Sequence, residues 1–129
     1  MSGNKAVLDT NIIILASKQK IDTAVLLEKY DDFYVSIITY MEVYGYDFED
    51  SKEKEFIDEL FEGLEIMEIN KPIAEQVIIY RKRKTKKIKL PDAIILATAK
   101  FLNADLITND WDDFQGIDEQ VNINNTSVE

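Results

Sequence analysis

The stretch that decides the fold runs from residue 90 to residue 108 and reads LPDAIILATAKFLNADLIT. Pro91 suits the first turn of a helix, and the residues that follow, Asp92–Leu102, are apolar on nearly all sides. A helix of that kind is expected to be buried. Asp105–Thr108 then has the composition of a strand, so the stretch predicts a buried helix that leads into a sheet.

The same alternation of helix and strand extends over the rest of the chain. It predicts an α/β fold with a mainly parallel sheet of about five strands, covered by helices on both faces. With 129 residues, no internal repeat and no linker-like tract, residues 1–129 are expected to form a single domain. The other expected strands are Lys5–Asp9, Phe33–Ile37, Leu64–Ile69 and a weak Val121–Ile123. One further helix is expected to begin with Ile12–Ala16. The remaining expected helices are Asp22–Tyr30, Thr39–Phe48, Ser51–Glu62 and Pro72–Lys84.

Two residue types are missing, and their absence excludes several kinds of chemistry. The chain has no cysteine and no histidine. Disulfides, thiolate nucleophiles, Ser-His-Asp triads and zinc sites built from Cys and His are therefore excluded. An enzyme of this composition would depend on carboxylates, Lys, Tyr, Ser or Thr, and an all-oxygen site suits a hard cation such as Mg²⁺.

The charge is unevenly distributed along the chain. The net charge is −10, which argues against nucleic acid as a partner for the protein as a whole. Residues 81–89, here called the basic segment, hold 7 of the 15 basic residues and no acid. The remainder has 8 basic residues against 25 acidic ones, a net charge of −17. A local patch of this kind decides where a phosphate backbone can dock.

The hydropathy pattern predicts a cytoplasmic protein with no membrane partner. The apolar fraction of 46% and the charged fraction of 31% are typical of soluble globular proteins. No apolar run approaches the roughly 18 residues of a membrane span. The first residues become charged too early for a signal peptide.

Four acidic residues fall where the expected fold would bring them together. In open α/β sheets, sites form beyond the carboxyl ends of the strands. Asp9 ends the first expected strand, and Asp110 lies two residues past the fourth. Glu42 lies in the first turn of the helix after the second strand, and Asp92 in the first turn of the buried helix. We therefore expect these four acids to converge at one edge of the sheet.

Each of the four acids also has an ordinary structural explanation. Asp9 can cap the helix that follows it, and Glu42 can form a Thr-x-x-Glu capping box with Thr39. Asp92 can be stabilised by the helix dipole, and Asp110 can lie in a solvated loop. Their joint placement, rather than any single residue, indicates a site.

A cluster of carboxylates needs compensation by positive charge. Two carboxylates about 4 Å apart repel each other by about 4 kcal/mol at an effective dielectric constant near 20. Mg²⁺ binds through a few carboxylates while it keeps waters and takes phosphate oxygens of a substrate. One or two such ions can activate water and stabilise the leaving oxygen in phosphodiester hydrolysis, and this chemistry needs no histidine.

Four segments, spread over nearly the whole chain, resemble a known family. The first is Leu8-Asp9-Thr10-Asn11, and the second is the Ser-x-x-Thr-x-x-Glu pattern of residues 36–42, followed by Val-Tyr-Gly. The third is the hydrophobic helix of residues 90–99 with an Asp at its start, and the fourth is residues 106–110, followed by Phe114. In this order and at these separations, the segments resemble those of the PIN-domain nucleases, and among them the VapC-type toxins of bacterial and archaeal toxin–antitoxin pairs.

The resemblance implies a three-layer α/β/α fold and a metal-dependent endoribonuclease. It implies Mg²⁺ or Mn²⁺, and hydrolysis of single-stranded or looped RNA that leaves a 5′-phosphate. The four acids become the catalytic and metal-binding residues, although Asp112 or Asp113 can take the place of Asp110 or add to it. Toxins of the family commonly form homodimers, and an antitoxin blocks them with a tail that enters the acidic groove.

Further residues near the four acids are expected to support them or to bind substrate. Thr10 and Thr108 are expected to support the acids by hydrogen bonds from their hydroxyl groups, and to contact the substrate. The basic segment immediately precedes Asp92, so its residues Arg81, Arg83, Lys86 and Lys87 are expected to hold the RNA backbone. Alternatively, the segment is an exposed helix end that serves solubility, or it binds an acidic patch of a protein. Trp111 is expected either to stack on a base or to lie partly in the core.

Three other functions compete with a toxin ribonuclease. One is an RNA-processing PIN nuclease outside toxin–antitoxin systems, and another is a non-catalytic PIN scaffold that binds RNA or a partner protein. The intact set of four acids speaks against the scaffold. The third is phosphotransfer through an aspartyl nucleophile, which would favour a pattern such as Asp-x-Asp at the first strand. Asp9 instead has Leu8, Thr10 and Asn11 as neighbours, so this function ranks last.

Overall fold

The protein is built around a five-stranded, all-parallel sheet. The computed structural model describes residues 4–126 of the chain. The strand order is β3-β2-β1-β4-β5, with β1 in the centre. The α/β class and the five parallel strands predicted from the sequence are therefore confirmed. The strands are β1 (Lys5–Leu8), β2 (Asp32–Ser36), β3 (Glu65–Met67), β4 (Asp105–Ile107) and β5 (Ile123–Asn124).

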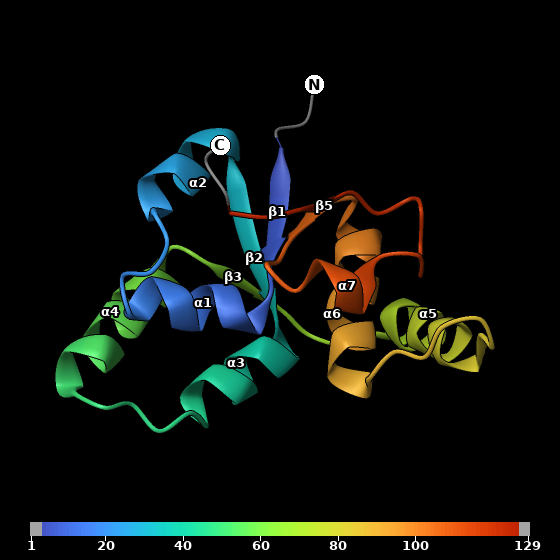
Figure 1. Ribbon diagram of the computed structural model, residues 1–129, viewed down its shortest axis with the longest axis horizontal. Coiled ribbons are helices and arrows are strands. Elements are labelled where there is room, and N and C mark those ends of the chain that lie inside the picture. Colours follow the sequence, from blue (N-terminus) through green and yellow to red (C-terminus); the bar gives the residue numbers. More distant parts are fainter. Residues whose placement is uncertain (1–3, 127–129) are drawn as a thin grey trace.

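Helices cover both faces of the sheet and make the predicted three layers. In Figure 1, helices α1 to α4 lie on one side of the sheet and α5 to α7 on the other. Within residues 4–126, no helix combines the length and the apolar character needed to span a membrane. The helices are α1 (Thr10–Ser17), α2 (Thr23–Lys29), α3 (Ile37–Tyr44), α4 (Ser51–Glu62), α5 (Lys71–Lys82), α6 (Leu90–Leu102) and α7 (Trp111–Phe114).

The central strand contributes to two separate hydrophobic cores. Val7 packs into the core under α5 and α6, whereas Ala6 and Leu8 pack into the core under α1 and α4. Successive side chains of a strand point to opposite faces, so a strand with three consecutive buried apolar residues must be covered on both sides. This requirement explains why the apolar sequence of β1 forms a central strand and not an edge strand.

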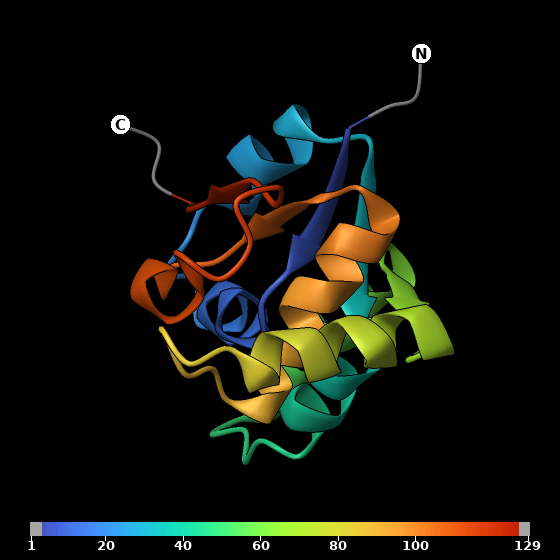
Figure 2. The ribbon, with the colours of Figure 1, turned by 90° about the vertical axis from the view of Figure 1, so that its right-hand side faces the viewer.

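Helix α6 is the buried helix predicted from residues 92–102. Seven consecutive residues, from Ala93 to Ala99, are buried. Figure 2 shows α5 crossing in front of α6, and α6 in turn packs against the sheet. The helix ends at Asn103, whose backbone adopts the left-handed conformation with φ of 58°. Asparagine tolerates this conformation better than most residues, and it is a frequent helix terminator for that reason.

The start of α3 differs from the sequence prediction. The helix begins at Ile37, directly after β2, and the hydroxyl of Ser36 caps it by accepting a hydrogen bond from the Ile38 amide at 3.2 Å. The capping box of Thr39 and Glu42, given above as an alternative explanation for Glu42, is not formed, because both residues lie inside the helix. Thr39 is fully buried, and Glu42 is in the second turn and not in the first.

Several element boundaries also differ by a few residues. The helix expected to reach Phe48 stops at Tyr44, and the last strand is Ile123–Asn124 in place of Val121–Ile123. The short helix α7 was not expected from the sequence. Four residues carry too little periodicity to indicate a helix, since an isolated turn is unstable without tertiary contacts.

A partly buried hydrogen bond of Tyr80 on α5 offers a test of this packing. Tyr80 is fully buried and donates a hydrogen bond to Asp118 at 2.6 Å, and Asp118 also pairs with Lys100 of α6 at 3.0 Å. We expect Tyr80→Phe to lower the free energy of unfolding by about 1–3 kcal/mol, because the carboxylate loses a donor. Urea unfolding followed by circular dichroism measures the change. The exposed Tyr40→Phe is the control, and an equal loss in both variants would contradict the assignment.

Candidate active site

The candidate site lies at the carboxyl ends of β1 and β4. Asp9 directly follows β1 and is the N-cap of α1, and Asp110 follows β4 and precedes α7. The strand order places β2 on one side of β1 and β4 on the other, so the order of connection reverses between β1 and β4. Open α/β sheets have their binding crevices at such a reversal point.

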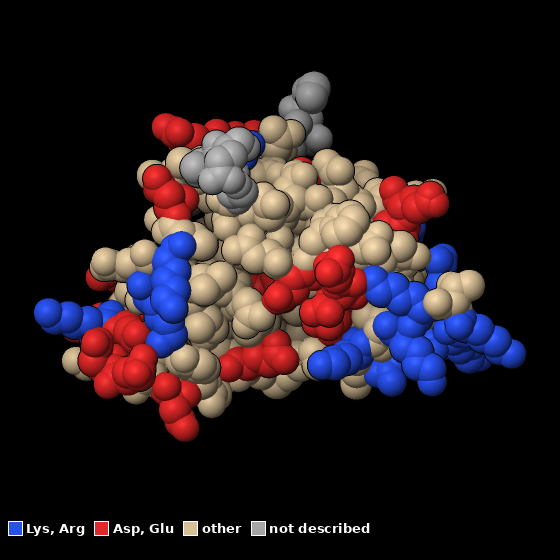
Figure 3. Space-filling view, in the orientation of Figure 1, with Lys and Arg blue, Asp and Glu red and all other residues tan. Residues whose placement is uncertain are grey.

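All four predicted acids line one cavity at this point, which we call the acidic pocket. Its volume is about 340 Å³. Asp113 also lines it, whereas Asp112 does not. Figure 3 shows acidic side chains gathered near the middle of this face, with a dense group of basic side chains to their right. The lining residues are Asp9, Thr10, Asn11, Glu42, Lys89, Pro91, Asp92, Asp110 and Asp113.

A chain of hydrogen bonds links the ends of β1 and β4. The Thr108 hydroxyl donates a hydrogen bond to Oδ2 of Asp9 at 2.7 Å and accepts one from the backbone amide of Asp110 at 2.9 Å. The Asn11 side-chain amide donates to Oδ2 of Asp110 at 2.7 Å. The Thr10 amide donates to Oδ1 of Asp9 at 2.8 Å, so Asp9 caps α1 and also lines the pocket. Thr108 is fully buried, so it supports Asp9 and offers no surface for contact with a substrate.

Glu42 is held by a second, shorter set of hydrogen bonds. The Thr10 hydroxyl donates to Oε1 of Glu42 at 2.6 Å. The same hydroxyl lies 3.1 Å from the hydroxyl of Thr39, one turn earlier on α3. Helix α3 therefore presents Glu42 to the pocket, and Thr10 at the start of α1 fixes its direction.

The carboxylates of the pocket are oriented by neutral donors and not by cations. None of the ion pairs found within residues 4–126 involves an acid of the pocket. Five acids and a single basic residue, Lys89, line the cavity. The pocket therefore concentrates negative charge that the described part of the protein does not balance.

Burial and mutual repulsion make ionisation of two of these acids difficult. Asp9 is only 5% exposed, and this burial raises its pKa to about 6, although hydrogen bonds from Thr108 and Thr10 lower it. The pKa of Asp92 is also raised to about 6, first by burial and then by the charges of Asp113 and Glu42. Raised pKa values caused by burial and neighbouring charges in a cavity are typical of functional sites.

The donor set suits a hard divalent cation. Within residues 4–126, no group of three or more acids is arranged so that it could hold a metal ion by itself. Mg²⁺ keeps several waters and commonly uses only one or two carboxylates, so a pocket of separated carboxylates fits a hydrated ion. The unbalanced charge of the pocket favours such an ion as well.

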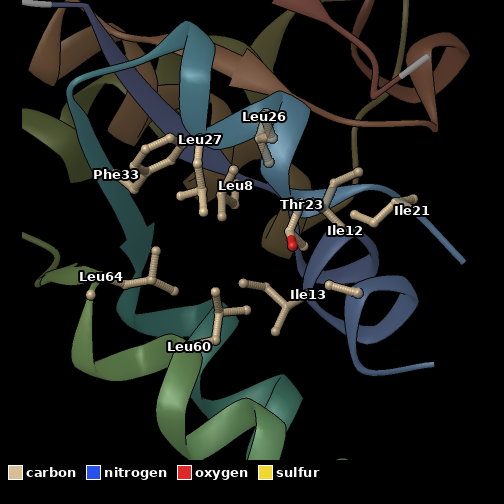
Figure 4. A pocket seen from close by; sticks show the side chains of 12 residues that line it. Leu8, Ile12, Ile13, Ile21, Thr23, Leu26, Leu27, Phe33, Leu60 and Leu64 are labelled. Atoms are coloured by element: carbon tan, nitrogen blue, oxygen red, sulfur yellow. The ribbon is translucent and has the colours of Figure 1, made fainter. Parts of the chain in front are cut away.

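The structure has another hollow, but its lining excludes acid–base or metal chemistry. It lies between α1, α2 and α4 and has a volume of about 60 Å³. Leucine, isoleucine and phenylalanine side chains point into it in Figure 4, and Thr23 is its only polar side chain among the lining residues. No titratable group lines it. We assign the candidate active site to the acidic pocket because five acids converge there at the reversal point of the sheet.

Three residues of this site were not among those predicted. Asn11 orients Asp110, Thr39 approaches Thr10, and Lys89 lines the pocket. Asn11 and Thr39 both lie inside sequence segments that resemble those of the family, so the sequence alone could have indicated them. Lys89 was counted only as part of the basic segment. Trp111 is 51% exposed, so it is not part of the core.

Comparison with known families identifies the fold. The sequence model of the family described as PIN domain matches residues 6–120 of the chain. The chain is a PIN-domain protein. The family predicted from the four sequence segments is therefore confirmed. Comparison with curated protein sequences finds no significant match.

Solved structures similar to this PIN domain come from toxin–antitoxin complexes. A chain of the toxin–antitoxin complex from Klebsiella pneumoniae is 34% identical, with 90% of this chain and 94% of that chain covered and a TM-score of 0.70. A chain of VapBC-1 from nontypeable Haemophilus influenzae is 26% identical, with 94% and 97% covered and a TM-score of 0.74. VapBC2 from Rickettsia felis, at 24% identity, 95% and 99% coverage and a TM-score of 0.80, shares the fold.

The pKa of Asp92 leads to a prediction about stability. Since the folded state holds the Asp92 proton more tightly than the unfolded state, ionisation costs stability as the pH rises through about 6. In metal-free buffer at pH 8, we expect Asp92→Asn to be more stable than the wild type by about 1 kcal/mol, net of the lost interaction with the α6 dipole. At pH 4 the difference should vanish. Thermal unfolding in EDTA at both pH values tests this, and a loss of stability at pH 8 would refute it.

Proposed function

We propose that this PIN domain is a divalent-metal-dependent endoribonuclease that hydrolyses RNA phosphodiester bonds. The observation that carries the proposal is the acidic pocket, where five acids converge at the reversal point of the sheet with a single lysine and, within the described residues, no ion pair. Membership of the PIN-domain family supports a nuclease activity. The protein lacks histidine and cysteine, so the carboxylates are the groups available for this reaction.

Each acid has a role that follows from its surroundings. At a site of this kind, Mg²⁺ or Mn²⁺ supplies charge neutralisation and an activated water. Asp9 is the most buried of the acids that can bind the ion, and Thr108 holds it in place. Asp92, whose pKa is also raised by burial, is suited to bind the ion beside it. Glu42 and Asp110 complete the set, with Asp113 beside them, and they orient water through their free carboxylate oxygens. Lys89 lines the same cavity and is suited to hold a phosphate oxygen.

The RNA strand is proposed to lie across the basic segment and reach into the acidic pocket. Arg81, Arg83 and Lys87 are exposed, and they are suited to contact successive phosphates. Figure 3 shows a dense group of basic side chains next to the acidic ones. Trp111 is exposed next to Asp110 and offers a flat surface on which an unpaired base can stack. This arrangement favours single-stranded or looped RNA.

We further propose that the protein is the toxin of a toxin–antitoxin pair, acting in the cytoplasm as a homodimer. The 34% identity to a chain of the Klebsiella pneumoniae toxin–antitoxin complex supports an antitoxin partner. An antitoxin tail that carries a basic residue would be attracted to the unbalanced charge of the acidic pocket. Ile78 and Ile79 on α5 are each more than half exposed, and a second copy of the chain would cover such a surface.

Two other functions compete with this one. An RNA-processing nuclease outside toxin–antitoxin systems would use the same pocket and differ only in its partners. A non-catalytic scaffold would keep the fold but would have no need of the hydrogen-bonded acids. Calorimetric titration with Mn²⁺ separates the scaffold from the nucleases, because a protein that binds no metal near millimolar concentrations would be the scaffold.

The decisive test of the proposed function is to remove the charge of Asp9. We expect Asp9→Asn to lower Mg²⁺-dependent RNA cleavage by at least about 100-fold, because it removes the most buried carboxylate of the pocket. Asparagine is an equally good N-cap for α1, so the far-ultraviolet circular dichroism should be unchanged. Cleavage of a fluorescently labelled single-stranded RNA measures the activity.

Asp112→Asn is the matched control for this test. Asp112 is an exposed acid two residues from Asp110, and its side chain does not line the acidic pocket. It should retain wild-type cleavage. Full activity in Asp9→Asn, or an equal loss in both variants, would rule out the proposed site.

A further inference from the structure

One lysine of the basic segment differs from its neighbours in what it contacts. The Lys86 ammonium donates to the backbone carbonyls of Asp112 and Gln115, the latter at 2.7 Å. Lys86 is partly buried, whereas Arg83, Lys84 and Lys87 are exposed. Its positive charge is therefore directed into the protein and not toward a phosphate backbone. The expectation that Lys86 binds substrate, as its neighbours are proposed to do, does not fit these contacts.

One carbonyl belongs to Asp112 of α7 and the other to Gln115, which directly follows this helix, and α7 needs outside support. Helix α7 has only four residues and no side-chain cap at its N-terminus. The last carbonyls of a helix lack partners within it and carry partial negative charge, so a lysine there both satisfies and stabilises them. Phe114, which is 1% exposed, anchors α7 on its inner side. Lys86 supplies a second attachment from the loop that follows α5.

This attachment joins two segments that both line the acidic pocket. Lys86 stands six residues before Asp92, while Asp110 and Asp113 flank or belong to α7. Asp92 experiences repulsion from the charges of both of these residues. The two segments would tend to separate unless something holds them together. A link from Lys86 to α7 opposes that separation.

We propose that Lys86 is a positioning residue that holds Asp110 and Asp113 opposite Asp92 in the acidic pocket. It binds backbone carbonyls and not carboxylates, so it restrains the acids without neutralising their charge. A lysine paired directly with the acids would compete with a divalent cation for them. The catalytic consequence of this role rests on the proposed ribonuclease activity, but the restraint on α7 does not.

The neighbouring Lys87 provides a matched comparison for kinetics. Lys86→Met and Lys87→Met remove the same charge one residue apart, and Lys87 is exposed. We expect Lys86→Met to lower kcat for RNA cleavage by about tenfold to a hundredfold, with KM changed less than about threefold, because misplaced groups slow the chemical step. Lys87→Met should instead raise KM and weaken the salt dependence of RNA binding, with kcat unchanged.

A second measurement reports on α7 without any need for activity. Trp111 is the only tryptophan of the chain and the first residue of α7. In metal-free protein without RNA, we expect Lys86→Met to increase the acrylamide quenching of Trp111 and to lower its fluorescence anisotropy. Lys87→Met should match the wild type in both. If Lys86→Met fails to fold, Lys86→Gln, which shortens the side chain and removes its charge, serves in its place.

The outcomes separate this inference from the proposed function. Equal Trp111 fluorescence in the wild type and both variants would overturn the role of Lys86, whatever the RNA assay gives. A Trp111 effect with unchanged kcat in Lys86→Met would overturn its positioning of the acids. A wild type that cleaves no RNA, with the Trp111 difference intact, would overturn the proposed function and still support the link to α7.

Discussion

The structure depends on the concentration of negative charge at the carboxyl ends of β1 and β4. Five acids line one cavity there with a single lysine, and Asp9 is almost completely buried. Carboxylates are costly to bury unless they are paired or hydrogen-bonded. The protein meets this cost with hydroxyl and amide donors from Thr108, Thr10 and Asn11, which orient the charges but do not cancel them. Such an arrangement opposes folding locally, so the rest of the molecule must compensate for it.

The two hydrophobic cores provide that compensation. The central strand β1 is buried on both faces, and α6 is buried along seven consecutive residues. At about 25 cal/mol per Å² of buried apolar surface, cores of this kind offset an unfavourable cluster of a few charges. The carboxyl ends of β1 and β4 are therefore rigid attachment points. Asp9, which directly follows β1, is held at the pocket by the sheet, whereas Asp110 and Asp113 lie beyond the end of β4 and also depend on the restraint of α7.

The sequence could predict the parts of this arrangement that depend on local patterns. Asp9 was placed correctly because two apolar strand residues precede it, and Asp92 because Pro91 and an apolar run mark the start of α6. The Thr39–Glu42 capping box failed because Ser36 joins β2 to α3 without a loop, which only the tertiary structure determines. Likewise, no local pattern shows that Lys86 reaches α7, since its partners are backbone carbonyls 26 and 29 residues away. Contacts of this kind have no sequence signature, because any residue supplies the acceptor.

The acidic pocket and the basic segment act in opposite directions on a nucleic-acid partner, since one repels phosphates and the other attracts them. A body of charge −17 outside the basic segment repels RNA in general, and this repulsion falls off over the Debye length of about 8 Å at physiological salt. Within that distance, a strand that meets the exposed lysines and arginines beside the pocket is attracted, while a strand that meets the bare carboxylates is repelled. A divalent cation held by these carboxylates would remove the second effect without altering the first. In the proposed reaction, the same ion would both supply the chemistry and admit the substrate, so RNA would have little tendency to enter a pocket that is not ready to cleave it.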